Sequence, residues 1–381
     1  MPFQNEAGNI AQGLTQGQGF CCVFRQPTGP TAWLTPVYPL LLAGIFKLFG
    51  VFTVNSFYAA ALCNCLFSSL VCVPLFFAGK RVGGIFCAAL AAWIWALFPS
   101  GIIMPFEWIW DTSLSALVAA ILLLATLRLA DRFELRAATA YGALCGFSLL
   151  VNPALGSLLP FFLGWIAYQQ SRLHNWNPKP LLLTVALALV ICLPWTIRNA
   201  VQFHRLIPLR SNFPFELWIG NNEIYDQHSR EVNRITRYEQ VHLYQQLGET
   251  AFLADKWQRA KTFIFEHPAL SMRLAGQRAI ATWLGTATPY ADFLRADSTL
   301  VRFIFLWNTV TLIGLLAGIA RLLVARSMFA FPLAIVPLVF PLVYYFTQTS
   351  LRLRHPCDPV LALLLALAIA LPAHKFVNEV T

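Results

Sequence analysis

Long runs of apolar residues, separated by short polar connections, make up most of this chain. A run of about 20 apolar residues is long enough to cross the hydrocarbon core of a bilayer as a helix. The pattern therefore predicts an all-α polytopic membrane protein, built as a helical bundle. We expect about nine spans, at 54–78, 83–100, 110–127, 138–151, 154–168, 181–198, 299–323, 327–347 and 357–373.

Three apolar runs are shorter than a helix needs to be to cross the membrane. The runs at 138–151 and 154–168 are short and flank Pro153, which interrupts helical hydrogen bonding. They form either two short spans joined by a tight turn or one region of broken helices. The run at 36–50 is also short and carries Lys47, so it predicts an interfacial helix rather than a span.

The segment 199–298 lacks a run of spanning length and predicts one mostly helical outer domain. In it, "ETAFLADKWQRAKTFIFEH" has the period of a helix, and a second helix starts at Pro268 and is closed by Gly285. The second helix mixes arginine with large apolar residues, so it lies on the membrane surface or packs on the domain's own core. The other expected regions are a first outer loop with interfacial helices (1–53), an N-terminal transmembrane core (54–198) and the C-terminal spans (299–375).

Composition agrees with a membrane protein and argues against other classes. Hydrophobic residues make up 58% of the chain and charged residues 12%, whereas soluble domains have about 25% charged residues. The net charge of +10 is explained by basic residues that set topology, so no nucleic-acid partner is predicted. The nine cysteines lack the spacing of metal ligands. No metal centre or cofactor is predicted, although dependence on a divalent metal stays open.

Lysine and arginine are concentrated in every second connection. The connections 99–110 and 152–153 contain none. Because basic residues favour the cytoplasmic side of a membrane, the basic connections are predicted to be cytoplasmic, and 1–53, 99–110, 199–298 and 351–360 to lie outside. The first ten residues have neither the basic nor the apolar region of a signal peptide. The residues that set this topology are Lys80, Arg81, Arg128, Arg132, Arg136, Arg172, Lys179, Arg321, Arg326 and Lys375.

The stretch "LRLRHPCDPV" (351–360) places basic residues in a short connection on the predicted outer side. Arg352, Arg354 and His355 lie there beside prolines that stiffen the chain. Arginine binds phosphate bidentately and stays charged when partly desolvated, so a lipid-linked phosphate suits this cluster. The alternative is that the arginines only anchor a helix end to headgroups. We favour the phosphate site, since ionisable residues at membrane depth are by default functional candidates.

Acidic residues are predicted at the same outer surface. Glu6 begins a short amphipathic helix, and Asp111 and Glu107 lie at the outer end of the third span. Glu6 and Asp111 each have a structural alternative, because a carboxylate complements a helix N-terminus and aspartate is a good N-cap. Together with the arginines, these carboxylates suit sugar transfer from a phosphate carrier. A base takes the acceptor proton in that reaction, and cations stabilise the departing phosphate.

Aromatic and amide residues follow in "RSNFPFELWIGNN" (210–222). Trp218 and Asn221 are candidates for contacting a sugar, by ring stacking and by amide hydrogen bonds respectively. Asparagine and glycine are equally good turn residues, so we favour a turn at the asparagines. Trp218 remains the stronger candidate of the two.

Five stretches follow one another along nearly the whole chain: "NEAGNIAQGLTQGQGF", "PTGPTAWLTPVYPLLLAGIFKLFG", "WDTSLSAL", "LPWTIRNAVQFHRLIPLRSNFPFELWIGNN" and "RLRHPCDPVLALLLALAI". In this order they resemble bacterial integral-membrane glycosyltransferases of the GT-C superfamily. The most similar group is the glycosyltransferase family 39-like proteins, which are related to protein mannosyltransferases and to lipid A aminoarabinose transferase.

The resemblance implies a GT-C-like bundle that moves a hexose or pentose from a polyprenyl-phosphate carrier to a lipid, glycan or protein acceptor. Its partners would be the polyprenyl-phosphate-linked sugar and membrane lipids, on the outer face of the bacterial inner membrane. By the same resemblance, Glu6 is the catalytic base, Asp111 supports it, and Arg352 and Arg354 bind the carrier phosphate. The sequence predicts neither the identity of the sugar nor the oligomeric state.

Two departures from that group keep other hypotheses open. Many relatives have Asp-Glu where this chain has Asn5-Glu6, and they have a span before this motif, where the printed sequence begins at Met1. We expect that the first span is lost, misplaced or supplied by a partner subunit, or that this is an inactive copy. A further alternative is a transporter or flippase for lipid-linked sugars. Transporters usually show internal repeats and polar sites at the membrane midplane, and neither is found in this sequence.

Overall fold

The computed structural model describes residues 4–24, 27–174, 176–222, 238–285 and 299–370. Within these ranges the chain is helical, with one isolated β-bridge between Cys21 and Pro30. The all-α prediction is confirmed. The helices are α1 (Glu6–Thr15), α2 (Val37–Phe49), α3 (Val54–Leu70), α4 (Cys72–Ala96), α5 (Pro99–Glu107), α6 (Thr112–Leu129), α7 (Leu135–Val151), the short η1 (Pro153–Leu158), α8 (Leu159–Arg172), α9 (Pro178–Phe203), α10 (Phe213–Gly220), α11 (Tyr238–Glu266), α12 (Pro268–Leu284), α14 (Thr299–Val324), α15 (Ala330–Val339), α16 (Leu342–Phe346), α17 (Leu351–Arg354), the short η3 (His355–Cys357) and α18 (Asp358–Ala370).

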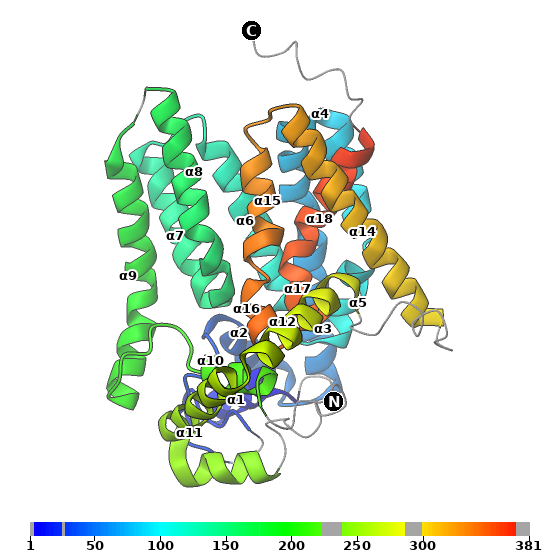
Figure 1. The fold of residues 1–381 in the computed structure, drawn as a ribbon. Helices are drawn as coiled ribbons and strands as arrows, with labels where there is room; N and C mark the ends of the chain where they lie inside the picture. The colour runs from blue at the N-terminus through cyan, green and yellow to red at the C-terminus, as the bar shows by residue number, and fades with distance from the viewer. Residues whose placement is uncertain (1–3, 25–26, 175, 223–237, 286–298, 371–381) are drawn as a thin grey trace.

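Long apolar helices run side by side through one part of the molecule, and α1, α2, α10 and α11 gather at one end of them (Figure 1). This arrangement is a membrane bundle with a smaller polar end. Five helical stretches in the described part of the chain are apolar and long enough to cross a membrane: Val54–Glu107, Thr112–Leu129, Pro178–Phe203, Arg302–Val324 and Leu351–Ala370. Shorter apolar helices cover Val37–Phe49, Leu135–Val151 and Ala330–Phe346.

The longest of these stretches, Val54–Glu107, folds back on itself as a helical hairpin. The chain reverses beside Gly84, whose φ of 80° lies in the left-handed region that favours glycine. The arms approach closely, since a Cβ placed on Gly79 would lie 2.9 Å from the Cα of Ala88. The two arms correspond to the first two spans predicted from the sequence.

The two short apolar runs around Pro153 form two helices, α7 and α8, that run in opposite directions and are joined by the short turn η1, which is the first of the two alternatives expected. The Asn152 side chain ends α7 and accepts a hydrogen bond from the Ala154 amide at 3.1 Å, which starts η1. The predicted span at 327–347 is also interrupted, because Pro341 separates α15 from α16.

The stretch 351–360 forms helical turns rather than the loop expected from the sequence. It consists of α17, η3 and the start of α18, and it is buried from Arg354 onward. These turns pack against α4, α6 and α14, and they begin the last apolar stretch, Leu351–Ala370. The charged side chains are tolerated there because polar partners inside the bundle bind them.

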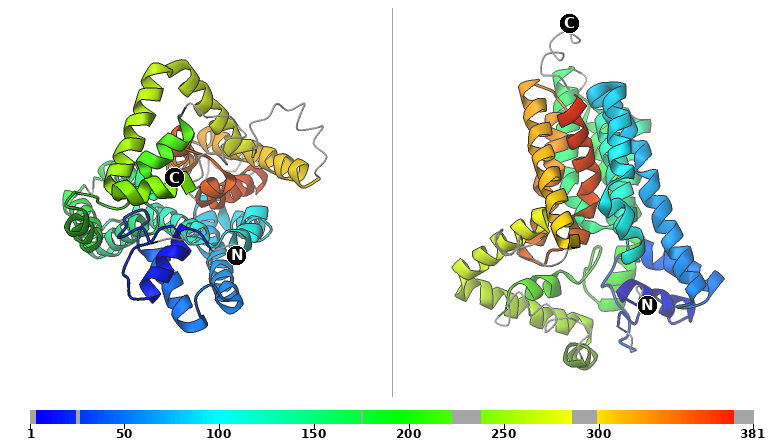
Figure 2. Two further views of the ribbon diagram at one scale, coloured as in Figure 1. Left: turned by 90° about the horizontal axis from the view of Figure 1, so that it is seen from below. Right: turned by 90° about the vertical axis from the view of Figure 1, so that its right-hand side faces the viewer.

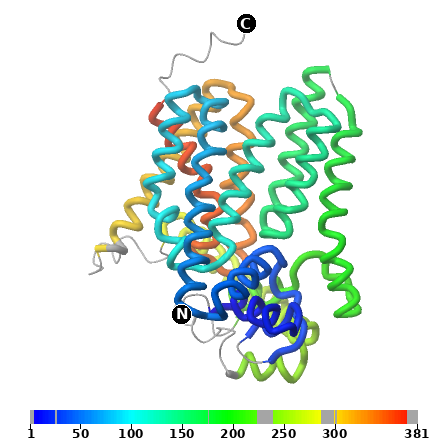
Figure 3. The backbone as a smooth tube through the Cα atoms, turned by 180° about the vertical axis from the view of Figure 1, so that it is seen from behind, coloured from blue at the N-terminus to red at the C-terminus, as the bar shows by residue number. Residues whose placement is uncertain are grey.

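The end of the bundle opposite α1 and α10 carries the basic connections. Arg81, near the hairpin turn of α4, forms an ion pair with Asp131 after α6. The Arg81 guanidinium also lies 5.5 Å from the ring centre of Phe329, just before α15. The turns from α6 to α7, α8 to α9 and α14 to α15 all lie at this end (Figures 1 and 3). Lys375, which was predicted to belong with them, lies outside the described residues.

The polar end has an apolar core of its own, formed by the segment after α1 together with α10 and α11. Trp33, Phe215, Tyr244 and Phe252 pack there with ring centres 5.3 to 6.1 Å apart. The helix α11 is interrupted at Gly248, and α12 covers the residues predicted for the second helix of this region. Figure 2 shows α11 and α12 extending to one side beneath the long helices.

Candidate active site

A cavity lies where the polar end meets the long helices. Six parts of the chain line it: the start of α1, the start of α2, the start of α6, the end of α7, the segment that leads into α10, and the segment from α16 to η3. Its volume is about 930 Å³, including the part open to solvent. The charged residues that line it are Asp111, Arg210, Glu216 and Arg352. Two guanidinium groups and two carboxylates thus line one cavity, although they lie up to 241 positions apart in the sequence.

Arg352 enters this cavity from α17 and is held by aromatic rings. Its guanidinium lies 4.8 Å from the ring centre of Trp108 and 4.6 Å from that of Trp110. Indole faces attract a guanidinium without neutralising it. Arg352 therefore keeps its charge for a ligand, and the tryptophans place that charge beside Asp111, which follows them directly in the chain.

Asp111 faces the cavity and does not act as the helix cap that its position in the sequence suggested. Its side chain makes no capping bond to α6, and instead one carboxylate oxygen accepts a hydrogen bond from the Ser115 hydroxyl at 3.3 Å. Burial raises the pKa of Asp111, and the charges of Arg210 and Arg352 partly oppose this shift. A carboxylate with a raised pKa holds a proton more readily, which suits proton transfer near neutral pH.

Glu6 is the first residue of α1, as predicted; it does not line the cavity itself, but the next residue, Ala7, does. The neighbouring Asn5 caps the helix by accepting from the Gly8 amide at 3.1 Å, and its amide donates to the Ile109 carbonyl oxygen at 3.1 Å. The start of α1 is thereby fixed to the segment that carries Asp111. Burial raises the pKa of Glu6, and the charge of Arg352 opposes the shift.

Two charged cavity residues, Arg210 and Glu216, were not identified from the sequence. Glu216 accepts a hydrogen bond from the Asn212 amide at 3.1 Å and another from Gln348. Burial raises the pKa of Glu216, opposed first by Arg210. A usable signal was present in "FPFELWIG", because a single carboxylate in an otherwise apolar eight-residue helix needs a polar partner.

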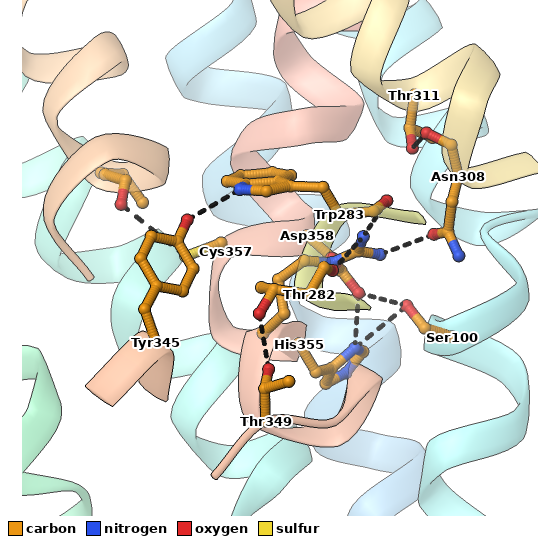
Figure 4. Close-up of polar contacts among 12 residues, drawn as sticks. Ser100, Thr282, Trp283, Asn308, Thr311, Tyr345, Thr349, His355, Cys357 and Asp358 are labelled. Carbon is orange, nitrogen blue, oxygen red and sulfur yellow. Dashed lines mark hydrogen bonds and ion pairs between the residues drawn. The ribbon is translucent and has the colours of Figure 1, made fainter. Parts of the chain in front are cut away.

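Arg354 and His355 belong to a buried network outside the cavity (Figure 4). Arg354 pairs with Asp358 at 3.0 Å and donates to the Asn308 side chain at 2.9 Å. The ring nitrogen Nδ1 of His355 lies 3.1 Å from Asp358 and 3.0 Å from Ser100. These partners come from α5, α14 and α18, so the network ties together the helices around α17. The prediction that Arg354 and His355 bind phosphate is therefore not supported by their surroundings. Both residues instead position the segment that carries Arg352.

The three remaining predicted site residues do not line the cavity. Glu107 is exposed at the end of α5. Trp218 is buried under the Lys256 ammonium, whose nitrogen lies 4.0 Å from the ring centre. Asn221 is buried as well, and its amide donates to the Leu217 and Phe346 carbonyl oxygens. Trp218 and Asn221 thus hold α10 in place rather than lining the cavity.

Together these helices have the fold of archaeal oligosaccharyltransferases whose structures are solved. The likeness is to the oligosaccharyltransferase of Archaeoglobus fulgidus. Its apo crystal structure aligns with a TM-score of 0.55 at 14% identity, over 96% of this chain and 46% of that one. The oligosaccharyltransferase AglB from the same organism, in complex with an inhibitory peptide and a dolichol-phosphate, aligns with a TM-score of 0.52 at 16% identity, over 95% of this chain and 45% of that one.

The chain therefore spans less than half the length of the oligosaccharyltransferase chains that it matches. ArnT from Cupriavidus metallidurans, bound to undecaprenyl phosphate, aligns with a TM-score of 0.43 at 14% identity, over 97% of this chain and 73% of that chain, a likeness too loose to support an argument. No protein-family model and no curated protein matches the sequence.

Proposed function

We propose that this protein transfers a sugar from a polyprenyl-phosphate carrier to an acceptor on the outer face of the bacterial inner membrane. One observation carries the proposal: Arg210 and Arg352 face Asp111 and Glu216 across a single cavity at the polar end of a GT-C bundle. A lipid carrier reaches such a site from the bilayer, while a polar acceptor reaches it from the aqueous side. The fold supports a glycosyltransferase in general, and the cavity supports a phosphate-linked donor.

The carrier phosphate is placed between Arg210 and Arg352. Guanidinium groups bind phosphate with two hydrogen bonds and remain charged in a partly dry site. The cavity lies at the level where α6 and α17 begin, so a lipid tail can extend between helices while its phosphate meets the arginines. The dolichol-phosphate bound by AglB supports a lipid phosphate as the ligand of this fold.

The reaction is a direct displacement at the anomeric carbon of the sugar. The acceptor oxygen forms a bond to C1, and the bond from C1 to the phosphate oxygen breaks, so its electron pair leaves with the polyprenyl phosphate. The acceptor proton passes to a carboxylate, for which we propose Glu6, with Asp111 supporting the position of Arg352 and the acceptor. The two arginines stabilise the charge that develops on the departing phosphate.

The distribution of basic residues supports the proposed orientation in the membrane, with the cavity on the outer side. The connections that carry Arg81 and Arg132 lie at the end opposite the cavity. Positive residues favour the cytoplasmic side, which supports an outer position for the cavity. No described residue of the cavity lies at the basic end, so donor and acceptor would meet on the outer surface.

Sugar transfer in bacterial membranes tests this proposal. A labelled polyprenyl-phosphate sugar pool is supplied, and wild type is compared with Glu6→Gln for label in acceptor and for free polyprenyl phosphate. The proposal predicts coupled release of both products, reduced at least a hundredfold by Glu6→Gln. Binding of the carrier that is unaffected by Glu6→Gln, without turnover in wild type, would favour a transporter or an inactive copy instead.

A further inference from the structure

We infer that Glu249 is a positioning residue for the cavity, because its carboxylate holds the segment 210–212 that presents Arg210 and Asn212 to the ligand. This inference rests on the proposed function of the cavity. Glu249 itself lies outside the cavity, at the start of the second part of α11. It is 5% exposed, and a carboxylate buried to that extent must be satisfied by hydrogen bonds.

Four donors converge on the two oxygens of Glu249. One oxygen, Oε1, accepts from the Ser211 hydroxyl at 2.7 Å and from the Ala32 amide at 2.9 Å. The other, Oε2, accepts from the Tyr244 hydroxyl at 2.7 Å and from the Thr31 hydroxyl. An ionised carboxylate has about four lone-pair positions, so all of its acceptor capacity is used.

The local backbone explains why a carboxylate is tolerated there. Gly248 precedes Glu249 with a φ of 75° and interrupts α11, so Glu249 lies in the first turn of a helix, where negative charge is favourable. A cation is also near. Arg198 donates to the Thr31 carbonyl oxygen at 2.7 Å and to the Phe20 carbonyl oxygen at 2.8 Å. The positive charge of Arg198 therefore lies near enough to interact with the Glu249 carboxylate.

Glu249 influences the cavity through the hydrogen bond that its Oε1 atom accepts from the Ser211 hydroxyl. This serine stands between Arg210 and Asn212, which both line the cavity, and it does not line the cavity itself. Its amide also donates to the Ala32 carbonyl oxygen at 2.8 Å. Two bonds from one serine and one from Ala32 thus fix the direction in which its two neighbours point. Within the described part of the chain, Oε2 accepts its hydrogen bonds from Tyr244 and Thr31, and neither residue lines the cavity.

A second anchor shows that this segment is held along its whole length. Trp195 Nε1 donates to the Leu209 carbonyl oxygen at 2.5 Å, and the Thr196 hydroxyl donates to that of Pro208 at 2.8 Å. These bonds join the residues before Arg210 to α9. Between the anchor on α9 and the anchor on Glu249, the Arg210 backbone has little freedom, and its side chain stays directed toward the carboxylates.

The two oxygens of Glu249 provide a matched pair of variants. Ser211→Ala removes one hydrogen bond from Oε1, and Tyr244→Phe removes one from Oε2 while keeping the buried ring. Each variant is compared with wild type for binding of polyprenyl phosphate in nanodiscs, for the pH dependence of transfer and for apparent Tm. We expect Ser211→Ala to weaken binding about 5- to 10-fold. It should also move the acid limb of the pH profile upward, because a displaced Arg210 no longer opposes the raised pKa of Asp111, whose carboxylate must be ionised to hold Arg352. We expect less than a twofold effect on binding for Tyr244→Phe, and similar Tm values for both.

Equal losses of binding in the two variants, or losses that follow Tm alone, would overturn the inference and leave Glu249 as a purely structural residue. Hydrogen exchange of the unliganded protein separates this outcome from failure of the proposed function. Glu249→Gln is expected to speed amide exchange in 31–33 and 209–213, with α12 unchanged. Unchanged exchange in 209–213 would refute the anchor. Absence of carrier binding and transfer in wild type would refute the function, and with it the positioning role.

Discussion

Arg352 and Arg354 are two positions apart in α17, yet their guanidinium groups have opposite surroundings. Arg352 lines the cavity between the rings of Trp108 and Trp110. Arg354 is 2% exposed and pairs with Asp358 at 3.0 Å inside the bundle. Arg352 is thus available to a ligand, whereas the Arg354 guanidinium is engaged in an ion pair inside the bundle.

Neutralising these two arginines should have different consequences. Arg352→Gln is expected to weaken binding of polyprenyl phosphate about 10- to 100-fold with little change in Tm, because a charge-assisted hydrogen bond contributes about 1.5–3 kcal/mol. Arg354→Gln is expected to lower stability by about 3–5 kcal/mol, because it leaves Asp358 buried without its cation. Carrier binding in nanodiscs and apparent Tm measure the two effects separately.

The control for the buried pair is the double variant Arg354→Met, Asp358→Leu. Removing both charges from a buried ion pair is often close to neutral. We expect this variant to recover most of the Tm lost in Arg354→Gln and to bind polyprenyl phosphate within about threefold of wild type. A stable double variant that binds no carrier would show that Arg354 contacts the phosphate after all.

Transfer should depend on pH through a carboxylate that must be ionised. Burial raises the pKa of Glu6 and of Asp111, and Arg352 partly lowers both. A general base works only when deprotonated, so the rate should fall about tenfold per pH unit below the raised pKa and level off above it. In Arg352→Gln the opposing charge is lost, so the same limb should move to higher pH. A limb that moves to lower pH in this variant would contradict the assignment.

Docking of α10 should be sensitive to a single methyl group. A Cβ on Gly220 would lie 1.7 Å from the Thr347 carbonyl oxygen. Gly220→Ala must therefore separate α10 from the segment that carries Gln348, at a cost of about 1–3 kcal/mol or more, and transfer should fall at least tenfold. Gly276→Ala in α12 is the control, because nothing lies within 4 Å of its Cβ position. Equal transfer activity of Gly220→Ala and Gly276→Ala would disprove that the close approach of Gly220 to Thr347 contributes to transfer.

The buried Lys256 should make the stability of the outer region depend on alkaline pH. Burial lowers the pKa of Lys256 from 10.5 to about 8, opposed by Asp255. A depressed lysine pKa means that wild type gains stability as pH rises from about 8 to 10.5 and loses it as pH falls through 8. The shift corresponds to roughly 3 kcal/mol, partly offset by the contact with Trp218. Lys256→Met should therefore have the higher Tm below pH 8, and this advantage should disappear near pH 10.5.

The helices of this protein were largely predictable because their signals are local. Apolar length located the long helices, and Pro268 and Gly285 gave the bounds of α12. The basic residues of alternate connections marked one end of the bundle, to which Arg81 and its partner Asp131 belong. Local signals did not reveal that 351–360 is helical and largely buried, since a charged segment predicts exposure unless its buried partners are known.

The site was only partly predictable because it depends on contacts between distant residues. Asp111 and Arg352 were identified and do line one cavity, but Arg210 and Glu216 were missed. Arg354 has the same residue type as Arg352, and the two share Leu353 as a neighbour in the sequence. What separates them is the position of Asp358 one helical turn later, and this pairing became recognisable only once 351–360 was found to be helical.

The most direct test of the central claim is a structure of this protein in a nanodisc with bound polyprenyl phosphate. If Arg210 and Arg352 bind the carrier phosphate, phosphate density will lie in the cavity within hydrogen-bonding distance of both arginines, with Glu6 and Asp111 on the side open to the acceptor. A phosphate bound away from Arg352, or a carrier held at the basic end of the bundle, would contradict the proposed function.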